Sequence, residues 1–178
     1  MTSLLYFDCF SGIAGDMTAA ALLSVSGAEK ELRKALKGLP LAGYRLSVER
    51  GSSGGVAGTR VHVKVASGKA GARHLPEILA LLRRSSLPRE TTARASRCFE
   101  QLAHAEARVH GTTSDRVHFH EVGALDAIVD VVAGCFLFEC RGAPRSYCSS
   151  LPGGSGEAWS EHGKLLVKGT ATIDIYTG

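Results

Sequence analysis

Two aspartates and a glycine turn lie together near the N-terminus of this 178-residue chain. Residues 8–16 read DCFSGIAGD, so a carboxylate follows an apolar run and the glycines lead into an Ala- and Leu-rich segment. A turn of this kind before a helix presents backbone N–H groups to a phosphate, and the helix dipole adds to the attraction. No Lys-Ser or Lys-Thr pair follows, which excludes a Walker loop. Asp8 and Asp16 could instead hold a divalent cation that itself binds phosphates, and the simpler alternative is a capped helix after a tight turn.

A second group of polar side chains lies in residues 117–130, which read VHFHEVGALDAIVD. His118 and His120 would face the same side of an extended segment, because side chains alternate along a strand. Asp126 and Asp130 are four residues apart and would share one face of a helix. With Glu121, these imidazoles and carboxylates suit a first-row transition metal, Mg²⁺ or Mn²⁺. The alternative is a surface helix start with one satisfied buried aspartate.

Asp130 is the residue that this alternative explains least well. It interrupts the most apolar stretch of the chain, Ile128–Phe138, where an unpaired carboxylate is costly to bury. We therefore expect Asp130 to be largely buried and to have a charged or hydrogen-bonding partner.

The elements that must position these residues follow from hydrophobic periodicity and turn signals. Gly111 should end the longest helix, whose expected apolar positions are Cys98, Leu102, Ala105 and Val109. The predicted helices span residues 16–25, 29–37, 75–82, 89–110 and 124–140. The predicted strands span residues 4–9, 44–49, 60–65, 117–122 and part of 165–176, with a glycine-rich connection at 51–58. Because strands and helices interleave, we predict the α/β class, with helices packed on a mixed sheet in a single domain.

Composition places the chain among ordinary globular proteins. Hydrophobic residues make up 44% and charged residues 21%, and the net charge of +4 is too small to argue for nucleic acid. The five cysteines include no CxxC pair, which favours a reducing compartment over a disulfide framework or a zinc knuckle. The N-terminus lacks the pattern of a signal peptide, and Ile128–Phe138 is too short to cross a membrane. We expect a soluble cytoplasmic protein.

Four stretches of the sequence resemble the nickel insertion proteins of the lactate racemase cofactor pathway. Residues 6–17, YFDCFSGIAGDM, look like the opening signature of that family. Residues 102–111, LAHAEARVHG, resemble the helix end that precedes its second motif, and residues 117–130 match that motif almost residue for residue. Residues 85–88, SSLP, also fit. The resemblance runs from about Leu4 to Leu137.

The resemblance implies a biochemical activity. Members of the family insert Ni²⁺ into a pyridinium bisthiocarboxylate mononucleotide, forming a carbon–nickel bond flanked by sulfur ligands. The step consumes CTP and uses Mn²⁺ or Mg²⁺. In that family the N-terminal part is associated with the nucleotide, and a C-terminal domain follows that we expect this chain to lack. The chain would then be the nucleotide- and Mn²⁺/Mg²⁺-binding part of a nickel chelatase, a CTP-dependent lyase with Ni²⁺ as its substrate metal.

The same resemblance implies a single site built from both motifs. Its catalytic residues would be Asp8, Asp16, His120 and Glu121. The nucleotide would be bound by Ser11, Gly12, Gly15 and Asp126. The metal ligands would be Asp8, Asp16, His118, His120, Asp126 and Asp130. The expected partners are the nucleotide, the pyridinium mononucleotide precursor and a chain that supplies the C-terminal domain. We also expect a homo-oligomer. We expect the chain to bind neither nucleic acid nor a membrane.

The resemblance weakens after about Cys140. The family's His-Gly element survives at His162, but its proline-rich segment reads LVKGTAT at residues 166–172, with all three prolines absent. We interpret residues 1–142 as the nucleotide- and metal-binding α/β core and residues 143–178 as a divergent C-terminal segment of the same domain. Two other functions are compatible with the residues: a metal-dependent nucleotide phosphohydrolase, and a non-catalytic nucleotide- or partner-binding module, for which the absent prolines are the cue.

Overall fold

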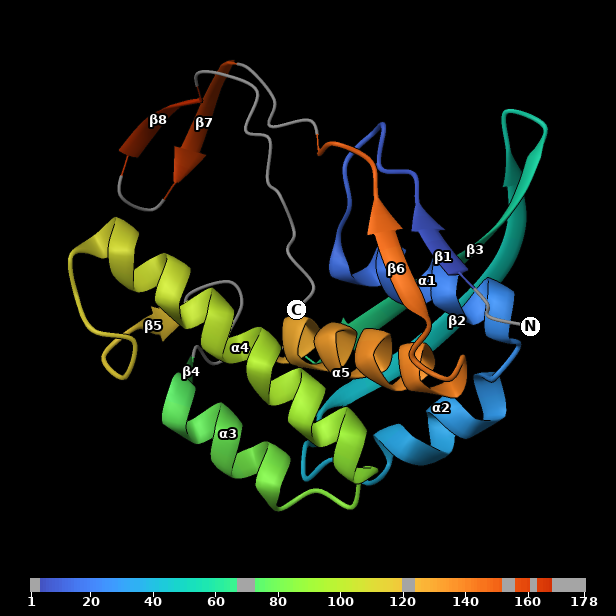
Figure 1. Cartoon of the computed structure of the whole chain (residues 1–178), viewed down its shortest axis with the longest axis horizontal. Coiled ribbons are helices and arrows are strands. Elements are labelled where there is room, and N and C mark those ends of the chain that lie inside the picture. Colours follow the sequence, from blue (N-terminus) through green and yellow to red (C-terminus); the bar gives the residue numbers. More distant parts are fainter. Residues whose placement is uncertain (1–3, 67–72, 120–123, 152–155, 161–162, 168–178) are drawn as a thin grey trace. The chain divides into compact units, whose positions relative to one another are not determined.

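The computed structural model describes residues 4–66, 73–119, 124–151, 156–160 and 163–167 (Figure 1). Contacts between residues divide the chain into two compact units. The larger unit is Gly15–Ala143, and the smaller unit joins Met1–Ala14 to Pro144–Gly178. Each unit is described by itself below.

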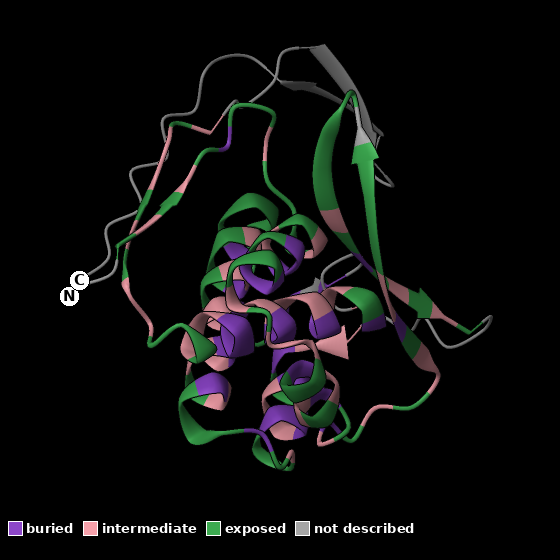
Figure 2. Ribbon diagram, turned by 90° about the vertical axis from the view of Figure 1, so that its right-hand side faces the viewer, coloured by how far each residue is buried: buried purple, intermediate pink, exposed green. Residues whose placement is uncertain are grey.

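Helix α5, Leu125–Cys140, is the centre of the larger unit. It packs against α1 (Gly15–Ser26), α2 (Glu29–Leu36) and α4 (Arg89–His110), and α4 also packs against α3 (Leu75–Arg83). In the larger unit, buried positions gather on the helix faces that meet one another (Figure 2). A helix that is apolar on most of its sides must lie inside a fold, because no face of it prefers water. The buried residues of α5 are Leu125, Ile128, Val129, Val132, Ala133, Cys135, Phe136 and Leu137.

Helix α4 has the bounds that the sequence predicts, but it buries a different face. Gly111 ends it in the left-handed conformation, with φ of 61°. The predicted apolar positions Ala105 and Val109 are exposed, so the predicted face is wrong in this part. Small side chains on the adjacent face of α4, such as Ala103 and Ala107, allow the neighbouring helices to approach closely. This close packing outweighs the burial of the larger apolar side chains on the predicted face. The buried positions of α4 are Thr91, Ala95, Phe99, Ala103 and Ala107.

A long hairpin completes the larger unit. Strands β2 (Tyr44–Ser53) and β3 (Val56–Val65) pair antiparallel over their whole length, and β3 packs on α1 and α5. The two predicted strands are confirmed, but both are longer than predicted, because only Gly54 and Gly55 form the turn. Both have positive φ, 58° and 81°, as a two-residue hairpin turn of this type requires. The remaining glycines of the connection lie within the strands.

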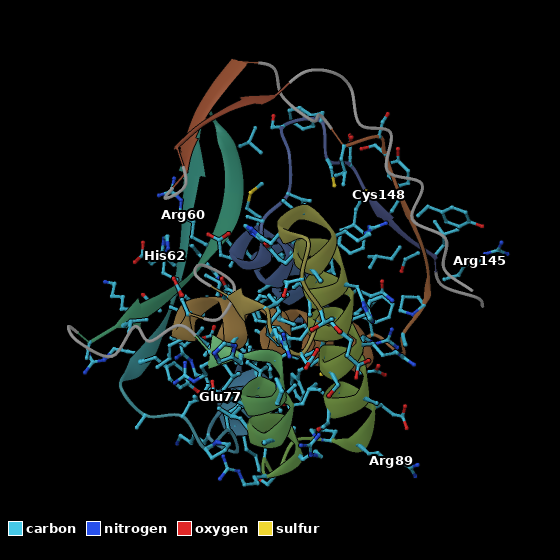
Figure 3. The ribbon with its side chains drawn as sticks, turned by 90° about the vertical axis from the view of Figure 1, so that its left-hand side faces the viewer. Arg60, His62, Glu77, Arg89, Arg145 and Cys148 are labelled. Carbon is cyan, nitrogen blue, oxygen red and sulfur yellow. The ribbon has the colours of Figure 1, made fainter. Side chains whose placement is uncertain are left out.

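A two-residue ladder introduces α3. Strand β4, Arg73–His74, pairs antiparallel with β5, His118–Phe119. The backbone N–H of His74 then donates to Oε2 of Glu77 at 2.9 Å, which satisfies one free donor at the start of α3 (Glu77 is labelled in Figure 3). The ladder thus joins the region before α3 to the beginning of the second motif.

The smaller unit contains two further ladders. Strands β1 (Leu4–Phe7) and β6 (Arg145–Cys148) pair in parallel, with Phe7 opposite Cys148. Strands β7 (Gly156–Ser160) and β8 (Gly163–Val167) pair antiparallel. β6 has no counterpart among the predicted elements. The predicted strand within residues 165–176 overlaps the end of β8, and residues 168–178 lie outside the described part.

The α/β class is confirmed, with parallel and antiparallel pairing both present. The described strands pair two by two in four ladders and do not form one continuous sheet. Within the described part, β1 pairs with β6, whereas β2 pairs with β3. Among the described residues, no helix is both long and apolar enough to span a bilayer.

Candidate functional site

The first and second motifs meet where α1 begins against α5. Gly15 is the first residue of α1, and a Cβ atom added to it would lie only 2.9 Å from Cβ of Asp130. One turn further along each helix, a Cβ atom added to Gly134 would lie 3.9 Å from Cγ2 of Thr18, which is an ordinary contact. Only glycine at position 15 leaves room for the Asp130 side chain. The sequence predicted a role for Gly15 at a phosphate, whereas here the residue is needed for the approach of two helices.

Asp130 lies beside two other carboxyl groups at this junction. Burial, together with the negative charges of Asp16 and Asp126, raises its pKa from 3.8 to about 7. Its Oδ1 atom is buried and has no hydrogen-bond partner within the described part of the chain. The expectation of a largely buried side chain is confirmed in the main, since Asp130 is only partly exposed and its Oδ1 is buried. The expected partner is not found within the described residues, because the neighbouring Asp16 and Asp126 carry the same charge.

The two neighbours of Asp130 occupy equivalent positions on their helices. Asp16 and Asp126 each lie in the first turn, where the helix dipole favours a negative charge. Oδ1 of Asp16 accepts the N–H of Met17 at 2.7 Å, and Oδ1 of Asp126 accepts the N–H of Ala127 at 2.9 Å. The two helix starts therefore hold both carboxylates in place beside Asp130. A carboxyl group among like charges takes up either a proton or a cation.

The glycine turn of the first motif belongs to the smaller unit. The N–H of Gly12 donates to the carbonyl of Cys9 at 2.9 Å, and Gly12 has φ of 89°. The N–H of Cys9 donates to Oγ of Ser149 at 2.8 Å, and the N–H of Ser149 donates to the carbonyl of Phe7. Asp8 and Ser11 are exposed. Asp8 and Asp16, which the sequence assigns to one metal, thus lie in different units. The surroundings of each aspartate are described within its own unit.

Residues that the sequence did not single out support this turn. Sγ of Cys148 lies 3.5 Å from Sγ of Cys9 (Cys148 is labelled in Figure 3), and Ser149 accepts the hydrogen bond described above. Burial raises the pKa of the Cys9 thiol, and Cys148 and Asp8 raise it further. No local pattern connects residues 139 positions apart in sequence. The pairing of β1 with β6 is what brings them together.

The histidine part of the second motif is described only in its backbone. His118 pairs with His74 across the β4–β5 ladder, and Nδ1 of His74 lies 3.0 Å from the carbonyl of Val117. His120, Glu121 and His162 lie outside the described residues. Among the residues that the structure describes, no three His, Cys, Asp or Glu side chains are arranged as a metal site. The three aspartates of the α1–α5 junction are neighbours without forming a ready set of ligands.

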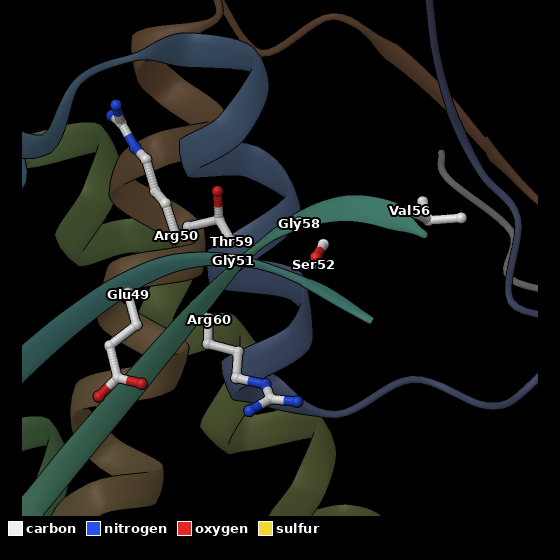
Figure 4. Close-up of a pocket in the computed structure, with 8 residues that line it drawn as sticks. All are labelled: Glu49, Arg50, Gly51, Ser52, Val56, Gly58, Thr59 and Arg60. Carbon is white, nitrogen blue, oxygen red and sulfur yellow. The ribbon is translucent and has the colours of Figure 1, made fainter. Parts of the chain in front are cut away.

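A separate pocket of about 210 Å³ lies on the β2–β3 hairpin and contains no residue predicted for the site (Figure 4). Arg50 and Thr59 occupy opposite positions of the two strands, as do Glu49 and Arg60. Oγ1 of Thr59 accepts a hydrogen bond from Oγ of Ser24 on α1 at 2.8 Å. The pocket is lined by Glu49, Arg50, Gly51, Ser52, Val56, Gly58, Thr59 and Arg60.

Both motifs of the chain therefore carry the carboxylates that the resemblance requires, and comparison with known proteins decides the family. A family model described as "Nickel insertion protein" matches residues 5–178. The chain belongs to the nickel insertion protein family. The resemblance seen in the sequence is confirmed and extends beyond Cys140 to the end of the chain.

Relatives of this family member come from several bacteria. A Roseiflexus castenholzii protein named for nickel insertion is 46% identical over 175 residues, which are 98% of this chain and 44% of the relative. A similarly named protein of Geobacter sp. (strain M21) is 43% identical over 173 residues, 97% of this chain and 45% of the relative. The pyridinium-3,5-bisthiocarboxylic acid mononucleotide nickel insertion protein of Staphylococcus epidermidis is 35% identical over 178 residues, 100% of this chain and 45% of the relative. The chain spans less than half the length of these relatives, and no solved structure matches it.

Proposed function

We propose that this chain is the nucleotide- and Mn²⁺/Mg²⁺-binding part of a protein that inserts Ni²⁺ into a pyridinium bisthiocarboxylate mononucleotide at the expense of CTP, in the synthesis of the lactate racemase cofactor. Membership of the nickel insertion family supports the overall role. The observation that carries the assignment to this part of the protein is the meeting of both motifs at the α1–α5 junction, with Asp16 and Asp126 beside Asp130.

The chemistry of the junction suits a hard divalent cation. Mg²⁺ and Mn²⁺ prefer carboxylate oxygens, and Oδ1 of Asp130 is buried without a hydrogen-bond partner among the described residues. Burial and the like charges of Asp16 and Asp126 raise the pKa of Asp130, so a cation bound there would replace a proton and relieve the repulsion. Asp16, Asp126 and Asp130 would hold the cation, with Asp8, His118 and His120 as further candidate ligands. When bound, the cation would neutralise charge on the triphosphate.

The other predicted residues have roles that follow from this arrangement. Ser11 and Gly12 would approach the nucleotide through the turn, and His120 and Glu121 would act as catalytic acid or base. Gly15 would contribute by allowing the helices to come together. Ni²⁺ and the pyridinium mononucleotide are the substrates. We also propose a homo-oligomer, a partner chain that supplies the C-terminal half, and a cytoplasmic location, the last because all five cysteines are free thiols.

Calorimetric titration of CTP with Mn²⁺, and of ATP as comparison, tests the nucleotide site. Asp126→Asn should weaken CTP binding by about tenfold or more, because it removes one negative ligand of the cation. Glu90→Gln is the matched control, since Glu90 is also an exposed carboxylate in the first turn of a helix, α4, away from the junction. Equal CTP affinities in the wild-type chain and both variants would contradict the site.

A turnover assay separates the proposed function from its two alternatives. CTP consumption that requires both Ni²⁺ and the pyridinium precursor supports nickel insertion. Consumption of CTP without them indicates a phosphohydrolase. Binding of CTP without turnover in the presence of both indicates a non-catalytic nucleotide-binding module.

A further inference from the structure

Two thiols meet where α4 packs against α5 in the larger unit. Sγ of Cys98 lies 4.0 Å from Sγ of Cys135, although the residues are 37 positions apart in sequence. Cys135 is buried with 6% of its surface exposed, whereas Cys98 is partly exposed. The pair therefore combines one partly exposed cysteine with one buried cysteine.

The surroundings of the two sulfurs are unequal in charge. Arg94 and Arg97 lie on the same helix as Cys98, and Arg94 is held by an ion pair with Glu139 at 2.7 Å and by stacking 4.6 Å over the ring of Phe138. A hydrogen bond with Cys135, assisted by the two arginines, lowers the pKa of Cys98 to about 7, although burial opposes the shift. The same hydrogen bond and deeper burial raise the pKa of Cys135. Cys98 is thus the nucleophilic thiol and Cys135 the thiol beside it that can complete a disulfide.

We propose that Cys98 and Cys135 are a redox-reactive pair that forms a reversible α4–α5 disulfide on reaction with a small-molecule disulfide such as oxidised glutathione. The Cys98 thiolate attacks one sulfur of the reagent, forming a mixed disulfide and releasing one glutathione thiolate. Cys135 then attacks Sγ of Cys98, its proton passes to the departing sulfur, and the second glutathione leaves. Two protein thiols are oxidised and one glutathione disulfide is reduced to two thiols, so electrons and protons balance.

The number of sulfur donors favours this chemistry over metal binding. Ni²⁺ and Zn²⁺ in proteins take four or more ligands, and in the described part of the chain no third His, Cys, Asp or Glu joins these two cysteines. The other thiol pair, Cys9 with Cys148, is closer at 3.5 Å and also combines a buried cysteine with a partly exposed one. Burial and exposure therefore do not distinguish the two pairs. The first attack needs a thiolate, and Arg94 and Arg97 favour the thiolate of Cys98.

The proposal is independent of nickel insertion, because it uses thiols that the candidate site does not contain. Its test uses the Cys140→Ser background, since trypsin leaves Cys135 and Cys140 together in peptide 117–141 and places Cys98 alone in peptide 98–108. The chain is equilibrated with oxidised and reduced glutathione, its remaining thiols are alkylated, and the peptides are identified by mass spectrometry. A cross-linked pair of these two peptides is the expected product.

Single variants in the same background assign the two roles. Cys135→Ser should abolish the cross-link and leave a glutathione adduct on Cys98, while Cys98→Ser should abolish both. Circular dichroism of each variant shows that it is folded. In the wild-type chain, Cys98 should react at least about tenfold faster than the lone exposed Cys140, whose pKa is raised by burial and by Glu31 and Glu139. A stable glutathione adduct on Cys98 with no cross-link while Cys135 is present, or equal rates for Cys98 and Cys140, would overturn the proposal.

Discussion

The α1–α5 junction and the glycine turn of residues 8–12 both come from motifs that predict a nucleotide site, yet they use their polar groups differently. In the turn, the N–H groups of Cys9 and Gly12 already donate to Ser149 and to the carbonyl of Cys9. At the junction, Asp130 has like charges as neighbours, and its Oδ1 has no hydrogen-bond partner among the described residues. These two N–H groups of the turn are already hydrogen-bonded within the chain, whereas the junction retains uncompensated negative charge. The difference favours a cation over bare backbone donors as the means of holding a triphosphate.

The largest expected effect is that of removing the divalent ion. In EDTA the affinity of the chain for CTP should fall by about two orders of magnitude, because a triphosphate beside carboxylates without a cation is repelled. Calorimetry with and without Mn²⁺ measures the change. Asp8→Asn should weaken CTP binding in Mn²⁺ and matter far less in EDTA. Tight binding that persists in EDTA and improves in Asp8→Asn would reverse the comparison and favour the turn.

A methyl group at Gly15 should disrupt the junction more than the same group at Gly12 disrupts the turn. Gly15→Ala places a Cβ atom 2.9 Å from Cβ of Asp130 and should cost about 2–3 kcal/mol of the free energy of unfolding. Gly12→Ala meets open space and suffers only the strain of its positive φ, about 1 kcal/mol. Urea denaturation of both variants gives the two values. An equal loss in both would show that Gly15 is not needed for helix approach.

Neutralising Asp130 should stabilise the chain, and more so at high pH. Its pKa is raised to about 7 in the folded state, from 3.8 ordinarily, so the stability that the protonated form contributes is complete below about pH 3.8 and is lost as the pH rises through 7. Asp130→Asn removes this loss and should gain about 1–2 kcal/mol at pH 8, a value reduced for partial solvent exposure, and little at pH 4. Thermal melts at both pH values measure the gain, and Glu90→Gln serves as control. A destabilised Asp130→Asn at pH 8 would mean that the carboxylate has a partner after all.

The smallest expected effect lies in the glycine turn. Ser149→Ala removes the acceptor for the N–H of Cys9 and should cost about 1 kcal/mol, the usual net value of one hydrogen bond. Ser150→Ala, at an exposed neighbouring position, is the control and should be within about 0.5 kcal/mol of the wild-type chain. Denaturant midpoints of the two variants test the difference, which disappears if water replaces the lost acceptor.

Local features of the fold were predictable and features that depend on packing were not. The bounds of α4 agree with those predicted, because Pro88 and Gly111 start and end the helix through their own backbone conformations. The face that α4 buries was mispredicted, since exposed Val109 and buried Ala107 are distinguished only by the neighbouring helices. The β2–β3 strands were predicted too short, because glycines within a strand give the same signal as glycines in a turn.

The sequence by itself determined the family and the residue types at the candidate site, because both depend on motifs that are continuous along the chain. The roles of the candidate site residues stay predictions, and two of them, His120 and Glu121, lie outside the described part of the chain. Only the tertiary structure decided that Gly15 contacts Asp130, that β1 pairs with β6 and that Cys98 lies beside Cys135. The physical reason is the same in all three cases. Each contact joins residues far apart in sequence, and the packing of whole elements brings them together where no local periodicity connects them.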